Sequence, residues 1–115
     1  MSLHEIIRNY DRLKTLALSA KLESKDMKES TITISNFGVL GGTGLWATPI
    51  INYPEAAIVA VNKIQKQPVV KNDQVAVVDT LNISWSFDHR FIDGDLAAKV
   101  SAHFCKLLHN PAQLL

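Results

Sequence analysis

Apolar side chains recur at spacings of three and four residues near both ends of the chain. Between residues 3 and 22 this spacing predicts an amphipathic helix, because most charged side chains fall on its other face. Between residues 93 and 109 the same spacing predicts a second helix, which Pro111 ends. The apolar positions of this second helix are Leu96, Val100, Phe104, Leu107 and Leu108.

The middle of the chain changes to patterns that are typical of strands. The sequence TITIS at 31–35 alternates and is rich in β-branched residues, so it predicts a strand. Residues 56–70 begin with a nearly continuous apolar run, which predicts a strand covered on both faces. After turn residues at 71–73, the segment 74–87 returns as another long strand. With a helix at each end, this order predicts an α+β fold with a mixed or antiparallel sheet.

The segment NFGVLGGTG at 36–44 holds four of the five glycines in the chain and predicts a loop. A glycine-rich loop after a strand can cradle a phosphate. This one lacks both the Gly-Lys-Ser/Thr ending and the dinucleotide spacing, and Pro49 disfavours a helix after it. The sequence therefore favours a glycine-rich turn over a nucleotide site.

Composition narrows the class of protein. The 115 residues are enough for one modest domain, and 47% hydrophobic residues can build a core. A net charge of +1 gives no general affinity for nucleic acid or for an acidic membrane. No apolar run approaches the roughly 20 residues that span a bilayer. A single cysteine, Cys105, excludes an intrachain disulfide. These features predict a soluble intracellular domain without nucleic-acid or membrane partners.

The segment SFDHRFIDGD at 86–95 places a histidine and an aspartate four residues apart where the last strand meets the last helix. If the strand persists that far, His89 continues its apolar row and is a hydrogen-bonded core histidine. The alternative is a general base at a cleft, because partial desolvation keeps an imidazole neutral near pH 7. Both interpretations stay open on the pattern alone. The row in question is Leu81, Ile83, Trp85 and Phe87.

The charged neighbours of His89 have structural interpretations too. Asp93 suits the N-cap of the following helix. Asp88 and Arg90 suit an ion pair, which could hold the corner or be a surface pair of little energetic value. Cys105 and His109 have the spacing of a metal-binding pair on a helix, but no second ligand cluster exists, so no metal site is predicted.

The heptad DHRFIDG, residues 88–94, resembles the H-x-x-x-D-G signature of the acyltransferase (E2) components of 2-oxo acid dehydrogenase complexes and of chloramphenicol acetyltransferase. Its D-H-R-x-x-D-G form is similar to the E2 version. The segments TITISNFG, the glycine pair at 41–42, TPIINYPEAAIVAV and the last helix resemble the E2 catalytic domain in the same order. The segment GGTGLWATPII looks closer to the acetyl and branched-chain types than to the succinyl type.

This resemblance implies acyl transfer between dihydrolipoamide and coenzyme A. His89 would be the general base that takes the proton from the thiol of coenzyme A or dihydrolipoamide. Ser35, in the T-I-S stretch, would donate a hydrogen bond to the tetrahedral oxyanion. Asp93 would hold the loop of His89 by hydrogen bonds. Without the resemblance, Ser35 reads as a serine that hydrogen-bonds its own loop.

The resemblance extends to the C-terminal half of the E2 catalytic domain, so residues 1–115 are expected to form a partial, chloramphenicol acetyltransferase-like catalytic domain. The lipoyl group, and the contacts with the E1 and E3 components, would belong to domains absent from this chain. A trimer-based homo-oligomer is implied, in the cytoplasm or, in a eukaryote, the mitochondrial matrix. The alternative function is a catalytically silent assembly module of the multienzyme core. The 115-residue chain by itself is expected to self-associate and to show little or no activity.

Overall fold

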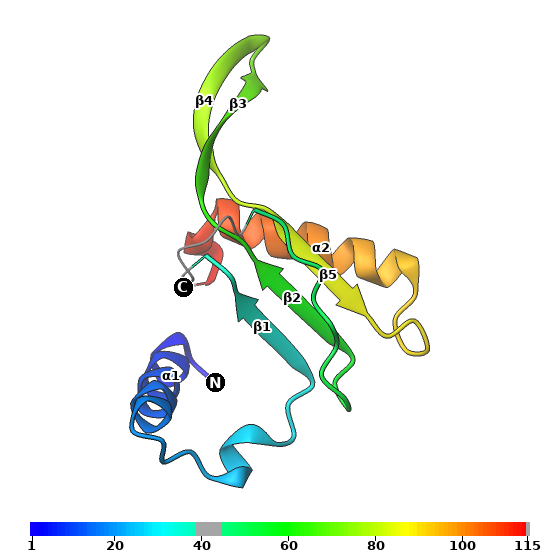
Figure 1. Ribbon diagram of the computed structural model, residues 1–115. Helices are drawn as coiled ribbons and strands as arrows, with labels where there is room; N and C mark the ends of the chain where they lie inside the picture. Colours follow the sequence, from blue (N-terminus) through cyan, green and yellow to red (C-terminus); the bar gives the residue numbers. More distant parts are fainter. Residues whose placement is uncertain (39–44, 115) are drawn as a thin grey trace. The chain divides into compact units, whose positions relative to one another are not determined.

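The computed structural model describes residues 1–38 and 45–114 (Figure 1). The chain divides into two compact units, and each is considered by itself. One unit combines Met1–Ser30 with Ala98–Leu115, and the other is Thr31–Ala97. The predicted glycine-rich loop lies largely outside the described residues.

Helix α1 (Leu3–Leu18) has a defined start and a defined end. The hydroxyl of Ser2 accepts a hydrogen bond from the backbone N–H of Glu5, and the carboxylate of Glu5 accepts one from the backbone N–H of Ser2. This reciprocal pair is a capping box. The helix stops four residues short of the predicted end because Ala20 takes a left-handed backbone conformation, with φ of 55°, and Lys21 N–H bonds back to Leu16.

Three further helical segments follow in the chain. A short 3-10 turn, η1 (Ser24–Met27), lies in the predicted charged connector. Helix α2 (Gly94–His109) spans the boundary between the two units, and its extent agrees with the prediction. A second 3-10 turn, η2 (Pro111–Leu114), begins at the proline that was expected to end the helix. Within the described ranges, no helix is both long enough and apolar enough to cross a membrane.

The unit Thr31–Ala97 contains a mixed three-stranded sheet in the order β1-β2-β5 (Figure 1). Its central strand β2 (Ala57–Val61) runs parallel to β1 (Ile32–Asn36) and antiparallel to β5 (Ile83–Phe87). The predicted α+β class and the mixed sheet are confirmed.

Strand β2 provides the buried centre of this unit. Its first four residues, Ala57 to Ala60, are all buried, and Val59 has no exposed surface at all. An apolar run of this kind is stable only when both faces of the strand are covered. The prediction of a strand covered on both faces is therefore confirmed.

The two long predicted strands are each divided in the structure, and this corrects the sequence-based boundaries. The segment 56–70 becomes β2 and β3 (Gln65–Lys71), and the segment 74–87 becomes β4 (Gln74–Thr80) and β5. Strands β3 and β4 leave the first sheet and pair with each other as a separate antiparallel hairpin, the twisted ribbon of Figure 1. Their turn residues Asn72 and Asp73 both have positive φ, as a two-residue type I′ turn requires.

A buried carboxylate fastens β1 to the segment that leads into β2. Glu55 is only 5% exposed, and it accepts hydrogen bonds from the hydroxyl of Thr33 and from the side-chain amide of Asn52. A buried acid requires such donors because removal from water penalises the charged form. Thr33 therefore contributes more to stability than a half-exposed strand threonine usually does.

We predict that Thr33→Val lowers the free energy of unfolding by about 1–3 kcal/mol, because valine keeps the shape of threonine but takes a donor from a buried carboxylate. Urea denaturation followed by circular dichroism measures the loss. Thr31→Val makes the same exchange at an exposed position of the same segment and is expected to cost less than about 0.5 kcal/mol. Equal losses in the two variants would contradict the role given to Thr33.

Candidate active site

His89 lies in a tight turn that directly follows β5. The backbone N–H of Asp88 still donates to the carbonyl of Ala56, at 2.9 Å, so sheet pairing extends to this residue. The carbonyl of Asp88 then accepts the N–H groups of Phe91 and Ile92, each at 3.0 Å, which closes the turn. The side chain of His89 is exposed on this turn.

The condition for a core histidine is therefore not met, and the continuation of the apolar row to His89 is wrong. The strand ends at Phe87, two residues earlier, because the backbone turns at Asp88 instead of remaining extended. Within the strand, Trp85 and Phe87 stack with ring centres 5.2 Å apart and planes inclined by 9°. Any desolvation of the imidazole must come from a surface that approaches the turn.

An ion pair within the turn fixes its corner. Arg90 Nη2 lies 2.6 Å from Asp88 Oδ2, and Arg90 Nε lies 3.0 and 3.1 Å from the two carboxylate oxygens. The backbone N–H of Arg90 donates to the same carboxylate at 3.0 Å. These bonds from Arg90 lower the pKa of Asp88 to about 2. The charge pair expected at these positions is confirmed. It links the residue before His89 to the residue after it.

Asp93 is the N-cap of α2. Its Oδ1 accepts the backbone N–H of Leu96 at 2.8 Å, and its carbonyl accepts the N–H of Ala97 at 3.0 Å. The predicted capping role is confirmed. Asp93 thus fixes where the turn enters the helix, whereas Asp88 closes the turn around His89.

Ser35 is the fourth residue of β1 and is half-buried. The strand register pairs it with Ala60 of β2, which pairs in turn with Ser84 of β5. Residues paired in register present their side chains on the same face of a sheet. Ser35 and Ser84 therefore occupy one row on one face, on either side of the small side chain of Ala60.

His89 and Ser35 lie toward opposite ends of the three-stranded sheet. Phe87, two residues before His89, pairs with Ala57 at the start of β2, whereas Ser35 pairs with Ala60 near its end. Three residues along a strand correspond to about 10 Å, and β1 and β5 are separated by the whole of β2. A hydrogen bond needs about 3 Å. A single copy of the chain does not bring these two side chains together.

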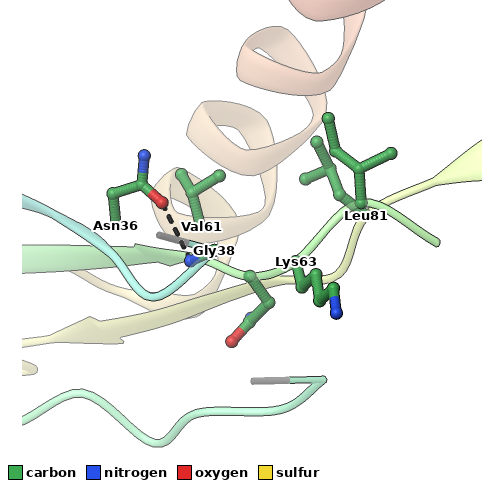
Figure 2. A pocket seen from close by; sticks show the side chains of 7 residues that line it. Asn36, Gly38, Val61, Lys63 and Leu81 are labelled. Atoms are coloured by element: carbon green, nitrogen blue, oxygen red, sulfur yellow. Dashed lines mark hydrogen bonds between the residues drawn. The ribbon is translucent and has the colours of Figure 1, made fainter. Parts of the chain in front are cut away.

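A cavity of about 420 Å³ opens where β1 ends and where β2 leads into β3 (Figure 2). Its lining includes Asn36, Gly38, Asn62, Lys63 and Leu81. A Cβ atom on Gly38 would lie 3.3 Å from the carbonyl oxygen of Asn62 and 3.5 Å from the Cα of Lys63, so a larger residue would crowd this end of the cavity. Asn36 Oδ1 accepts a hydrogen bond from the backbone N–H of Gly38 at 2.9 Å, which is the dashed line in Figure 2.

Sequence reasoning did not single out two residues that the structure makes prominent. Glu55 and Asn62 are the polar or charged residues that lie buried in the described part of the chain. Glu55 directly precedes the apolar run at 56–61, and Asn62 directly follows it. A polar residue at the edge of such a run could have indicated a buried polar group. The run was used only to predict a strand.

The possible metal-binding pair on the last helix, Cys105 and His109, does not have the geometry of metal ligands. The imidazole Nδ1 of His109 lies 2.8 Å from the backbone carbonyl oxygen of Cys105, an ordinary contact between successive helical turns. In the part of the chain that the structure describes, there is no group of three or more metal-binding side chains.

The mixed sheet, with a histidine turn leading into a capped helix, defines a chain of the expected α+β class. The family model for 2-oxoacid dehydrogenases acyltransferase (catalytic domain) matches residues 1–115, and the chain belongs to this family. It is 42% identical over 114 residues to the dihydrolipoyllysine-residue acetyltransferase component of the pyruvate dehydrogenase complex of Staphylococcus epidermidis, and 40% identical to that of Staphylococcus aureus. These matches cover 99% of this chain but 26% of each relative, so the chain spans about a quarter of their length.

Solved structures agree with this assignment. The dihydrolipoamide acetyltransferase of Azotobacter vinelandii superimposes with a TM-score of 0.85 at 36% identity, over 99% of this chain and 46% of that one. A structure of the cubic core of the pyruvate dehydrogenase multienzyme complex gives the same TM-score and coverage at 35% identity. In the Azotobacter protein, a serine, a histidine and an asparagine were investigated for their role in the catalytic mechanism.

The ion pair in the turn has a measurable consequence. The depressed pKa of Asp88 means that the pair is fully present above the ordinary value of 3.8 and is lost as the pH falls through about 2. We predict that Arg90→Gln returns the pKa of Asp88 toward 3.8, because its largest cause is the side-chain hydrogen bond from Arg90. Carboxyl chemical shifts followed by NMR during an acid titration measure it.

Lys66→Gln is the matched control, since it removes an exposed cation that pairs with Asp79 in the hairpin of the same unit. In this control the pKa of Asp88 should stay at about 2. An unchanged pKa in Arg90→Gln would show that the guanidinium does not hold the turn.

Proposed function

We propose that this chain is the acyl-transfer part of a dihydrolipoamide acyltransferase, which moves an acyl group between dihydrolipoamide and coenzyme A. The observation that carries the proposal is the fold of DHRFIDG, which presents His89 at the end of a strand in a turn held by Asp88, Arg90 and Asp93. Membership of the acyltransferase family along residues 1–115 supports the same reaction. The names of the relatives favour acetyl as the acyl group.

In the proposed reaction His89 accepts the proton of the attacking thiol. A thiol has a pKa near 8.5, so a neutral imidazole at the end of a fixed turn is a well-matched acceptor. The thiolate sulfur forms a bond to the thioester carbonyl carbon, and the carbonyl oxygen becomes an oxyanion. When the intermediate collapses, the bond to the departing sulfur breaks, and the imidazolium returns its proton to that sulfur.

Ser35 is proposed to donate its hydroxyl hydrogen to the oxyanion. Ser35 is half-buried and lies beside the small side chain of Ala60 in the sheet. A donor of this kind acts mainly in the transition state, where the negative charge develops. Asp93 takes no part in proton transfer and positions the turn through the cap of α2.

The reaction requires more than one copy of the chain. Because His89 and Ser35 lie at opposite ends of the sheet, we propose that His89 of one copy faces Ser35 of a neighbouring copy in a homo-oligomer built from trimers. The cubic core named for a related structure supports an assembly of many copies. The neighbouring copy would also supply the desolvation that His89 lacks in a single chain. The E1 and E3 components are its proposed partners in the cytoplasm.

We predict that His89→Ala, made in the complete acyltransferase to which this chain belongs, abolishes acyl transfer while the circular dichroism spectrum stays unchanged, because the side chain is exposed and its removal costs no core contact. Ser35→Ala should lower kcat by roughly a hundredfold or more with little change in KM, since an oxyanion donor stabilises the transition state selectively. The assay follows acetyl transfer from acetyl-dihydrolipoamide to coenzyme A.

Ser84→Ala and His103→Ala are the matched controls. Ser84 occupies the same row of the same sheet face as Ser35, and His103 is an exposed histidine on α2. Both should retain most of the activity. If His89→Ala retains most of the activity of the unsubstituted complete acyltransferase, the acyl-transfer mechanism fails and the silent assembly module becomes the better account. A change confined to KM would make Ser35 a binding residue.

A further inference from the structure

The side chain of Asn62 is buried, and only the nitrogen of its carboxamide has a hydrogen-bond partner among the described residues. The residue is 2% exposed, and its Nδ2 donates to the backbone carbonyl of Asn82 at 2.9 Å. The backbone N–H of Asn62 donates to the same carbonyl at 3.1 Å. Among the described residues, the carbonyl oxygen Oδ1 has no hydrogen-bond partner.

The orientation of this carboxamide is fixed by its donor side. The acceptor at Asn82 requires the NH2 group, so the oxygen must point away from that carbonyl. A buried carbonyl without a donor is unfavourable, because it loses water and gains nothing in return. Such a group needs a donor from outside the described residues, either a trapped water or a bound ligand.

Asn62 lines the cavity at the end of β1 and β2. The pairing of β2 with β5 continues through its backbone hydrogen bond to Asn82, so the residue is still extended. Strand alternation then puts Asn62 on the same face as Ala60, and therefore on the same face as Ser35. Asn62 therefore lies two residues further along the chain than Ala60, which is the partner of the proposed oxyanion donor Ser35.

We propose that Asn62 binds the thiol-bearing arm of the substrate by accepting a hydrogen bond from a secondary amide N–H of that arm. This inference rests on the proposed function, which places the reacting thioester at Ser35. It adds a specificity-determining residue, because a thiol without a suitably placed amide leaves Oδ1 unpaired in the complex.

Two thiol-bearing arms in the proposed reaction contain a secondary amide: the pantetheine arm of coenzyme A and the lipoyllysine arm. In pantetheine only two methylene groups separate the sulfur from the first amide nitrogen, whereas the lipoyl arm has a longer aliphatic chain. Since Asn62 is a diagonal neighbour of Ser35 in the sheet, the short spacing of coenzyme A fits better. The cavity, of about 420 Å³ and also lined by Lys63 and Leu81, leaves room for the rest of the arm.

The test compares thiols that differ only in the amide hydrogen, and it measures binding, not turnover. N-acetylcysteamine has the amide N–H two carbons from sulfur, and its N-methyl derivative lacks it. NMR titration of the full chain, read on the backbone amide resonances of Gly38 and Lys63 in the cavity lining, is expected to show three- to tenfold weaker binding of the N-methyl compound. Asn62→Ala should bind both equally weakly, whereas the control Asn36→Ala, which changes the other carboxamide of the cavity, should keep the discrimination.

N-alkyl dihydrolipoamide and its N-methyl derivative form the second arm of the experiment. Discrimination in this pair alone would assign Asn62 to the lipoyl arm, and discrimination in the cysteamine pair assigns it to coenzyme A. Equal affinities within both pairs for the parent chain overturn the proposal, as they would if a trapped water satisfied Oδ1, and this result does not require Asn62→Ala to fold. Loss of acyl transfer with retained discrimination would contradict the proposed function and leave the binding role of Asn62 intact.

Discussion

The central strand β2 is the constraint on which the rest of the unit Thr31–Ala97 depends. Its first four residues are buried, and it supplies hydrogen bonds to β1 on one side and to β5 on the other. The register with β1 fixes Ser35 beside Ala60, near the end of β2. The register with β5 fixes Phe87 beside Ala57, so the turn with His89 must project from the other end. One short buried strand thus sets the positions of both proposed reactive groups.

This geometry links assembly to chemistry. A slip of one residue in either register would turn Ser35 to the other face of the sheet or shift the His89 turn by one residue, and either change would remove a proposed reactive group from its place. Because the two groups are held at opposite ends, a single copy would supply half of each of two proposed sites. In the proposed assembly, association would therefore have a catalytic consequence, since each contact between copies would join the two halves of one site.

The sequence was sufficient for the elements whose signals are local. The apolar run at 57–60 identified the buried strand, Asp93 identified the start of α2, and Asn72 with Asp73 identified the hairpin turn. The divided strands were missed, because residues 62–64 contain neither glycine nor proline and alternation continues through 81–82, while the pairing partner changes. Strand pairing is a long-range property, so a local pattern does not report it.

The candidate site shows the same division between local and long-range information. The heptad DHRFIDG located His89, and its ion pair and helix cap follow from residues within five positions of it. The exposed position of His89 did not follow from alternation, because alternation describes extended backbone and the chain turns at Asp88. Neither the separation of Ser35 from His89 nor the free oxygen of Asn62 could be read from spacing, since both depend on the register of β2.

The most direct test of the central claim is activity restored by mixing two inactive chains. His89→Ala and Ser35→Ala, each made in the complete acyltransferase, are co-expressed in equal amounts, and acyl transfer is compared with each variant alone. If every site takes His89 from one copy and Ser35 from its neighbour, random assembly leaves both residues intact at about one site in four, and about a quarter of the parent activity returns. A mixture no more active than its two components would contradict the account.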